Sequence, residues 1–363
     1  GVVESLVVIV EELYQRLARM LVGRGGSRLV NGPTEDIWEC QSVPTSSFEH
    51  FKLRRWRGSD DESWAVERDL EGVAMLRANQ ADHASIATAG LAIGSVVREH
   101  SAREIGAEMT SNPIVRGLTF TGSTEIGRVL MEQCAPTIKK LGLELGGNAP
   151  FIVFDDADLE SAVNGSIAGI FGASGQSCVA GSRLYLHDKI ADQFLAMMVS
   201  RARQIRIGDP MLEDTQMGPL ATTGQLARIE KEVAFAEVQG AKLLTGGNRP
   251  ASPNRGWFYE PTIIECHDQS MRIVDTELFG PVLSVLRFKQ EDEVVKLAND
   301  TKHGLAAGVF TRDGARQMRV AKAIRAGIVW VNTYRVVSPI AAFGGVKGSG
   351  YGRESGFQAM YDY

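Results

Sequence analysis

The chain has 363 residues, of which 44% are hydrophobic and 23% are charged, and its formal net charge at pH 7 is −5. This length and composition are typical of a globular protein with more than one domain. The small negative charge excludes the broad basic surface by which proteins bind nucleic acid. The apolar run at residues 6–10 is flanked by Glu4 and Glu11 and is too short to span a membrane, so we expect no nucleic-acid partner and no membrane contact.

The four cysteines, Cys40, Cys134, Cys178 and Cys266, form no CxxC pair and show no metal-ligand spacing with histidine. A disulfide framework is not expected at this length and cysteine density. We therefore expect reduced thiols, a cytoplasmic location and no metal site. Cys134 and Cys266 are interpreted as buried and inert, which is the commoner state of a cysteine.

Residues 1–100 differ from the remainder in composition. They hold one lysine, Lys52, against ten arginines, whereas residues 101–363 hold ten lysines against eighteen arginines. Residues 2–22 have the apolar spacing of an amphipathic helix, but most of residues 31–85 show no clean periodicity. One hypothesis is that this segment results from a shifted reading frame or a gene-model error. Sequencing the transcript across residues 90–105 tests it.

From residue 101 onward, strand and helix patterns alternate along the chain. The predicted strands cover residues 118–121, 141–145, 150–154, 183–187, 242–244, 282–288, 306–311 and 328–332. The predicted helices cover residues 124–134, 158–170 with Asp158 as cap, a segment opened by Asp188, and residues 225–239, 291–299 and 315–325. This alternation predicts α/β layers with largely parallel sheets.

Two short segments of residues 101–363 are typical of covalent catalysis. Cys178 ends the Gly/Ser-rich stretch 172–178, and Glu144 lies on a predicted strand that ends in Gly146 and Gly147. A thiol so placed attacks a carbonyl carbon, and a carboxylate takes a proton from water or from the thiol. The alternatives are a buried, inert Cys178, an exposed Glu144 at a strand end, and a Cys–His dyad with His187.

Residues 101–363 resemble the aldehyde dehydrogenase superfamily. The match is carried, in the family's order, by residues 121–127 (TGSTEIG), 143–150 (LELGGNAP), 175–178 (GQSC), 277–281 (ELFGP) and 343–354 (FGGVKGSGYGRE). The resemblance implies an α/β fold with a partial Rossmann-type cofactor domain and an α/β catalytic domain. It also implies oxidation of an aldehyde with NAD or NADP through a cysteine thiohemiacetal and a thioester, which water hydrolyses to a carboxylic acid.

The resemblance assigns roles to individual residues. Cys178 corresponds to the nucleophile and Glu144 to the base that activates the hydrolytic water. Phe343 corresponds to an aromatic residue that lines the aldehyde tunnel, with core packing as the alternative. The residues implied to bind the cofactor are Gly122, Ser123, Gly127, Leu145, Gly146, Glu277 and Phe279. For these the alternatives are an ordinary helix cap at residues 122–127, an exposed acid at Glu277 and a core aromatic at Phe279.

Four further polar residues are interpreted as structural. Asn148 and Asn332 fit a turn and a strand end, and His187 fits a strand end. Arg183 lies five residues after Cys178 and could face a substrate carboxylate, but a surface position on a strand is the preferred interpretation.

The resemblance also predicts the domain organisation and the partners. Residues 1–100 are an unmatched segment, a degenerate or incomplete half of the cofactor domain. Residues 101–146 are the remainder of that domain, residues 147–345 the catalytic domain and residues 346–363 a tail at the domain junction. The expected partners are a small aldehyde and further copies of the chain, as a dimer or tetramer.

The sequence departs from the family at two expected motifs. Its Pro-Trp-Asn segment, whose asparagine donates to the oxyanion, and its Lys-Pro segment, whose lysine contacts the adenosine ribose, are absent from residues 1–100. Their absence supports one alternative to a general aldehyde dehydrogenase, a non-catalytic truncated remnant. A second alternative is a specific succinate-semialdehyde dehydrogenase, which residues 111–116 through 155–159 resemble. A thiol esterase that uses Cys178 without a nucleotide is a third.

Overall fold

The computed structural model describes residues 28–31, 36–44, 49–57 and 102–361. The chain divides into two compact units, residues 1–119 with 129–140, and residues 120–128 with 141–363. The predicted helix at residues 2–22 lies outside the described residues. The predicted domain boundaries at 146/147 and 345/346 stay predictions.

The first described strands form an antiparallel meander that the sequence did not predict. Strands β1 (Arg28–Asn31), β2 (Asp36–Pro44) and β3 (Glu49–Arg57) pair in the order β1-β2-β3. Charged and apolar residues do not alternate regularly in β2 and β3, so the period of two that marks a half-buried strand is missing. The helix α3 (Ala102–Ser111) follows and was also not predicted.

A small three-stranded sheet has the order β13-β5-β4. Strand β4 is Gly117–Thr121, the helix α4 is Thr124–Cys134, β5 is Lys140–Glu144 and β13 is Gly350–Tyr351. The predicted strands at 118–121 and 141–145 and the predicted helix at 124–134 are confirmed to within a residue. β13 was not predicted, because two residues carry no periodic signal, and it pairs antiparallel with β5, with Gly350 opposite Glu144.

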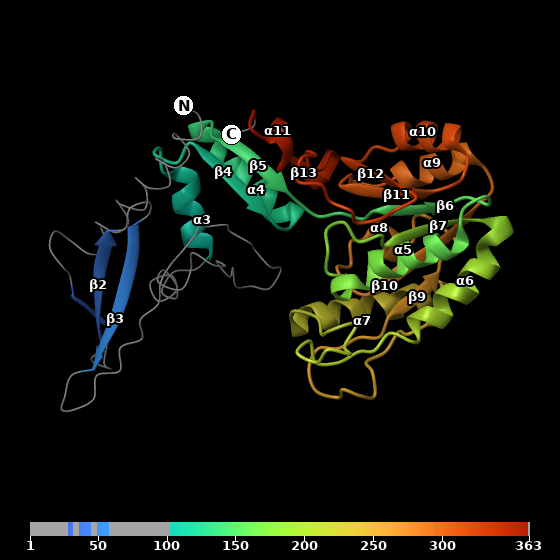
Figure 1. Ribbon diagram of the computed structural model, residues 1–363, viewed down its shortest axis with the longest axis horizontal. Coiled ribbons are helices and arrows are strands. Elements are labelled where there is room, and N and C mark those ends of the chain that lie inside the picture. The colour runs from blue at the N-terminus through green and yellow to red at the C-terminus, as the bar shows by residue number, and fades with distance from the viewer. Residues whose placement is uncertain (1–27, 32–35, 45–48, 58–101, 362–363) are drawn as a thin grey trace. The chain divides into compact units, whose positions relative to one another are not determined.

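The large sheet has seven strands in the order β12-β11-β6-β7-β10-β9-β8 (Figure 1). All its neighbouring pairs are parallel except β8 with β9, so the predicted α/β class with largely parallel strands is confirmed. Only β9 of these strands was not predicted. The strands are β6 (Pro150–Val153), β7 (Arg183–His187), β8 (Lys242–Thr245), β9 (Thr262–Glu265), β10 (Val282–Phe288), β11 (Ala306–Phe310) and β12 (Ile328–Val331).

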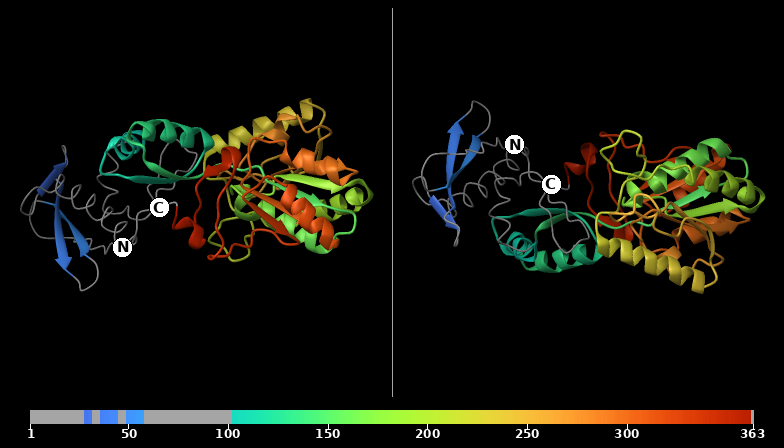
Figure 2. Two further views of the ribbon diagram at one scale, coloured as in Figure 1. Left: turned by 90° about the horizontal axis from the view of Figure 1, so that it is seen from above. Right: turned by 90° about the horizontal axis from the view of Figure 1, so that it is seen from below.

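Helices cover both faces of this sheet (Figures 1 and 2). On one face, α5 (Leu159–Phe171) and α6 (Asp188–Ala202) pack on one apolar cluster that includes Phe151, Leu184 and Val285. On the other face lie α7 (Thr223–Val238), α8 (Arg272–Asp275), α9 (Glu291–Asn299) and α10 (Gly314–Ala323). Successive side chains along the strands point to opposite faces of the sheet and so contribute to both apolar clusters, as expected for a parallel sheet buried on two sides.

Local sequence explains where these helices begin. Asp158 caps α5 as predicted, because its side chain accepts a hydrogen bond from the Ser161 N–H.

Cys134 and Cys266 are buried, also as predicted. Among the described residues, no helix combines the length and apolar character needed to cross a membrane.

Candidate active site

Three loops meet at one edge of the large sheet because each precedes one of three neighbouring parallel strands. Gly147 lies before β6, Cys178 before β7 and Glu277 before β10. In the register of the sheet, Arg183 lies opposite Pro150 on one side and opposite Ser284 on the other. Since parallel strands all start at the same edge, residues about 130 positions apart in the chain come together there.

The turn that presents Cys178 is held in an unusual backbone conformation. The 3₁₀ turn η3 (Gly172–Gly175) follows α5 directly, and Ala173 and Ser174 both have φ of 55°. Gly175 has φ of 70°, and a Cβ there would lie 2.0 Å from the Gly280 carbonyl oxygen. Only glycine fits this position, so the turn before Cys178 and the loop after Glu277 are packed backbone against backbone.

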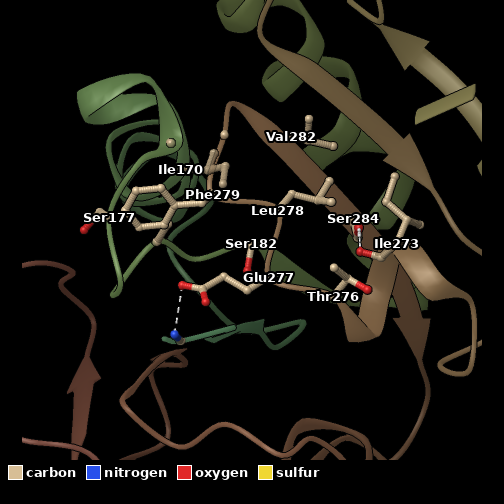
Figure 3. A pocket seen from close by; sticks show the side chains of 14 residues that line it. Ile170, Ser177, Ser182, Ile273, Thr276, Glu277, Leu278, Phe279, Val282 and Ser284 are labelled. Carbon is tan, nitrogen blue, oxygen red and sulfur yellow. Dashed lines mark hydrogen bonds between the residues drawn. The ribbon is translucent and has the colours of Figure 1, made fainter. Parts of the chain in front are cut away.

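Gly147 brings a third backbone into the same contact. A Cβ at Gly147 would lie 2.0 Å from the carbonyl oxygen of Cys178. The Gly147 N–H donates a 2.9 Å hydrogen bond to the Glu277 carboxylate, drawn in Figure 3. Gly147, Ser177, Glu277 and Phe279 line one small cavity (Figure 3). The structure thus brings Glu277, Phe279 and the neighbours of Cys178 together.

Two side chains of α7 that the sequence did not point to hold the loop of Glu277. The Gln225 side-chain amide donates to the Phe279 carbonyl oxygen at 2.8 Å, and the Arg228 guanidinium donates to the Glu277 carbonyl oxygen at 2.9 Å. Phe279 has φ of 55°, a strained conformation that such contacts stabilise. The spacing of Gln225 and Arg228 places them on one helix face, but nothing in the sequence links that face to residues 277–279.

Glu144 is the last residue of β5 and is enclosed. Its side chain is only 4% exposed, so the alternative of an exposed strand-end glutamate is wrong. Its backbone carbonyl accepts a hydrogen bond from Gly122 N–H at 3.0 Å. A Cβ at Gly344 would lie 2.9 Å from Glu144 Oε1, and Oε2 has no hydrogen-bond partner among the described residues. A buried carboxyl with an unsatisfied oxygen is typical of a functional group rather than a structural one.

The electrostatics tie Cys178 to both glutamates. Burial raises the pKa of Glu144 to about 8, with Glu354 raising it further and Arg353 lowering it. Burial likewise raises the pKa of Glu277 to about 7, against the Gly147 N–H. The pKa of Cys178 is raised to about 11 by burial first, then by Glu277 and by Glu144. Both carboxyls therefore act on the sulfur, and a protonated Cys178 needs a base to become a nucleophile.

Arg353 and Glu354 are site residues whose role the sequence reasoning missed, although they lie in the segment 343–354 that carries the resemblance. β13 brings them to Glu144 by its pairing with β5. An isolated antiparallel bridge between Phe343 and Glu354 holds the same segment together. The motif at residues 343–354 was recognised in the sequence. The pairing of β13 with β5, which brings Arg353 and Glu354 close to Glu144, cannot be inferred from the sequence.

The N-terminus of α4 lies beside Glu144. The Ser123 hydroxyl accepts from the Ile126 N–H at 3.3 Å, which is the arrangement of an ordinary helix cap. A Cβ at Gly127 would lie 2.6 Å from the Leu145 side chain. Gly127 therefore lets α4 pack closely against the end of β5. At Gly146, a Cβ would lie 2.2 Å from Glu277 Oε2.

These contacts test whether the residues present fit a nicotinamide dinucleotide. The first N–H groups of a helix have no partner within the helix and suit a pyrophosphate. The absence of a side chain at Gly146 leaves room for the Glu277 carboxylate, which a side chain there would displace. The described residues thus fit such a cofactor: Gly122 and Ser123 would hold its pyrophosphate, and Glu277 and Phe279 would hold its nicotinamide part.

Aromatic side chains lie on another side of Cys178. Cys178, Tyr334 and Phe343 pack against one apolar cluster that includes Val179, Leu305 and Trp330. The Tyr334 hydroxyl donates to the Val179 carbonyl oxygen at 2.9 Å. The structure thus places Phe343 and Cys178 against the same apolar cluster, and Tyr334 is a neighbour that the sequence did not point to.

The structure corrects the interpretation of Arg183. Arg183 is fully buried, not on the surface, and it faces no open site. Its guanidinium donates to the carbonyl oxygens of Asn148 at 2.9 Å and Ala298 at 3.0 Å and to the Tyr185 hydroxyl at 2.8 Å. A guanidinium surrounded by backbone carbonyls near the end of a helix stabilises that helix end. The alternating pattern of a strand does not reveal this, because arginine is rarely fully buried.

The other three polar residues have structural contacts, in line with their interpretation. Asn148 donates to the Val274 carbonyl oxygen at 2.8 Å. Asn332 follows β12 and donates to the Thr311 carbonyl oxygen at 3.0 Å. His187 ends β7, and its ring nitrogen accepts from the Lys189 N–H at the start of α6.

A model of the aldehyde dehydrogenase family matches residues 85–363. The match starts sixteen residues before the predicted position 101. Residues 85–101 lie outside the described part of the chain.

Several curated proteins are similar to the C-terminal part of the chain. A (Z)-2-((N-methylformamido)methylene)-5-hydroxybutyrolactone dehydrogenase of Acinetobacter baylyi is 48% identical over 261 residues, which are 72% of this chain and 53% of that protein. The succinate-semialdehyde dehydrogenase GabD of Escherichia coli, whose name specifies NADP(+), is 46% identical over 263 residues, 72% of this chain and 54% of GabD. The chain thus spans about half the length of the curated relatives that it matches.

Solved structures agree with the predicted fold. A crystal structure of an Escherichia coli NADP-dependent enzyme superposes with a TM-score of 0.71 at 46% identity, over 72% of this chain and 54% of the other. A betaine aldehyde dehydrogenase of Staphylococcus aureus in complex with NAD+ superposes with a TM-score of 0.69 at 40% identity, over 71% and 52%.

Proposed function

The chain belongs to the aldehyde dehydrogenase family, and we propose that it oxidises an aldehyde to a carboxylic acid with NAD+ or NADP+ as the oxidant. The observation that carries this proposal is the convergence of Cys178, Glu144 and Glu277, with both carboxyls acting on the sulfur. The fit of residues 122–127, Glu277 and Phe279 to a dinucleotide supports it.

In the proposed reaction the chain's own residues handle the sulfur and the protons. Cys178 Sγ bonds to the aldehyde carbon, the thiol proton passes to a base, and a thiohemiacetal forms on the protein. A bound nicotinamide dinucleotide supplies the acceptor for the hydride that this adduct releases. Glu144 then takes a proton from the water that attacks the resulting thioester, and the carbon–sulfur bond breaks to restore Cys178. With a pKa of about 8, Glu144 is suited to accept a proton near neutral pH.

The substrate is proposed as an aldehyde without a narrower assignment. Residues 111–116 through 155–159 look like succinate-semialdehyde dehydrogenase, whereas residues 179–183 and 332–337 look like general aldehyde dehydrogenases. The similar proteins include enzymes named for succinate semialdehyde and for betaine aldehyde. Oxidation of succinate semialdehyde is the more specific candidate.

We also propose a homo-oligomer, a dimer or tetramer, in a cytoplasmic location. Exposed apolar side chains at Val336, Val337, Ile340 and Phe357 support self-association. A nucleophilic Cys178 requires a reduced thiol, which a reducing compartment maintains.

The purified 363-residue chain tests the assignment. It should form NADH or NADPH from a short aldehyde, and Cys178→Ala should abolish this while leaving the fold intact by circular dichroism. The matched control is Cys266→Ala, which removes a buried thiol in another part of the sheet. Equal activity in wild type and Cys178→Ala would refute the assignment.

The second candidate is a non-catalytic remnant that keeps the fold of the catalytic domain. It is favoured by the absence of the Pro-Trp-Asn and Lys-Pro segments from residues 1–100. Losing an oxyanion donor costs roughly 10²–10³ in rate. Slow turnover that depends on Cys178 would support the enzyme. The absence of any turnover would support the remnant.

A further inference from the structure

The guanidinium of Arg335 lies beside the turn that leads to Cys178. Its Nη1 donates to the Ala168 carbonyl oxygen at the end of α5, at 3.2 Å. A Cβ at Gly172 would lie 2.6 Å from the same nitrogen. Arg335 therefore fills the space that a side chain at the first residue of η3 would take, six positions before the nucleophile.

Contacts of the neighbouring Tyr334 hold the backbone of Arg335 near Cys178. Arg335 has φ of 61°, and the preceding Tyr334 is bonded to the Val179 carbonyl oxygen. Tyr334 packs with Cys178 and Phe343 on one apolar cluster, and the charges of both Arg335 and Cys178 act on its hydroxyl. The segment that carries Arg335 is thus anchored next to the reacting sulfur.

The charge of Arg335 has no acidic partner within the described ranges. Nη1 makes its one hydrogen bond there, which leaves Nε and Nη2 to bind another acceptor. The other arginines described at this site all donate to backbone carbonyl oxygens. These are Arg183, Arg228 and Arg353. Arg335 is half-buried, and its guanidinium lies against the turn of residues 172–175 that leads to Cys178.

We propose that Arg335 determines the substrate class of this site and favours aldehydes that carry a carboxylate at the far end, the short ω-oxo carboxylates. A guanidinium fork pairs with a carboxylate through two parallel hydrogen bonds, which adds both attraction and orientation. The same charge repels a quaternary ammonium group, so aldehydes of the betaine type are disfavoured. The inference rests on the proposed function, and it adds a discrimination among aldehydes that the family assignment leaves open.

Steady-state kinetics test the inference with three aldehydes of different charge: succinate semialdehyde, its neutral methyl ester and betaine aldehyde. Wild type should have the highest kcat/KM for the anionic aldehyde. Arg335→Gln should raise KM for that substrate on the order of tenfold with kcat little changed, and should leave the ester unaffected. Arg335→Lys should keep part of the preference, and Arg203→Gln, an exposed arginine after α6, should keep all of it.

A second measurement does not depend on turnover. Two methanethiosulfonate reagents, one with a sulfonate and one with a trimethylammonium head group, each form a disulfide with a thiol and release methanesulfinate. Their rates at the Cys178 peptide are followed by mass spectrometry. The ratio of the two rates cancels any change in the thiolate fraction, so it reports the local charge alone. The ratio of anionic to cationic reagent should fall several-fold in Arg335→Gln.

The two measurements separate the two proposals. If no aldehyde is oxidised but the reagent ratio falls in Arg335→Gln, the proposed function fails and the charge recognition by Arg335 stands. If aldehydes are oxidised and Arg335→Gln changes neither the order of substrates nor the ratio, Arg335 is a helix-end contact only and the inference is overturned. A wild-type preference for betaine aldehyde also overturns it.

Discussion

At the scale of single residues, Glu144 shows a conflict between stability and chemistry. Its carboxyl is buried, one oxygen lacks a partner among the described residues, and Glu354 lies nearby. Each of these features disfavours the charged form. A base that works near neutral pH needs such an environment, since a fully solvated glutamate is too weak a base.

Glu144→Gln should therefore make the protein more stable while removing the proposed hydrolytic base. The pKa of Glu144 in the folded protein, about 8, lies above the ordinary 4.5. Below pH 4.5 Glu144 is therefore protonated in both the folded and the unfolded state, and its burial does not lower the free energy of unfolding. As pH rises from 4.5 through 8, the unfolded state ionises first and the folded state loses stability. We expect a gain of about 1–3 kcal/mol for the variant at pH 8.

Thermal unfolding of wild type and Glu144→Gln at several pH values checks this. The difference in melting temperature should shrink toward zero at pH 4.5, and Glu213→Gln, an exposed glutamate, should show no such trend. A variant that is less stable at pH 8 would mean that the Glu144 carboxylate is stabilised in the folded protein, contrary to its surroundings here.

At the scale of elements, most strands and helices after residue 101 were predicted with bounds close to those observed. Sharp local signals account for this, such as the Asp158 cap of α5 and the apolar run of β10. Several missed elements are too short for such signals: β13 has two residues, and α8 and β9 have four each. The helix α3, with ten residues, was missed as well. The meander β1-β2-β3 was missed because its residues do not alternate in polarity.

The convergence of the site could be predicted only in part. Cys178, Glu144 and Glu277 were chosen from their motifs and by resemblance. The proximity of the Cys178 and Glu277 loops follows from the order β6-β7-β10, whereas Glu144 ends β5 in the small sheet. No local pattern specifies which strands become neighbours. The contacts of Gln225 and Arg228 with the Glu277 loop and the burial of Arg183 depend on that same order, so the sequence alone did not reveal them.

The turn η3 gives a prediction at this scale. Gly175→Ala would place a methyl group 2.0 Å from the Gly280 carbonyl oxygen at a residue with φ of 70°. The turn or the Glu277 loop must then move, which should lower stability by at least about 2 kcal/mol. Alkylation of Cys178 by iodoacetamide should also change in rate, because the thiol loses its fixed position.

Gly314→Ala is the matched control for this change. No atom lies within 4 Å of a Cβ at Gly314, the first residue of α10. Alanine favours the helix there, so the variant should be unchanged or more stable by up to about 1 kcal/mol. Urea unfolding compares the two variants, and equal stabilities would show that the close approach of Gly175 and Gly280 is not a constraint on the fold.

At the scale of the whole molecule, the chain carries the proposed catalytic residues but only part of the proposed cofactor contacts. The family match covers residues 85–363, while the similar proteins are about twice the matched length. The described residues fit the pyrophosphate and nicotinamide ends of a dinucleotide. The Lys-Pro segment that the family uses for the adenosine ribose is absent from residues 1–100.

This imbalance predicts weak but saturable binding of NAD+ or NADP+ to the 363-residue chain. Loss of one hydrogen bond from a charged group costs about 1.5–3 kcal/mol, so the dissociation constant should exceed that of full-length relatives by at least about tenfold. Isothermal titration calorimetry measures it. Cys178→Ala should bind as wild type does, because the thiol is not a nucleotide contact, and Glu277→Ala should bind more weakly. Heats that never saturate with either nucleotide would favour the remnant over the enzyme, since a hydride acceptor that does not bind cannot complete the oxidation begun at Cys178.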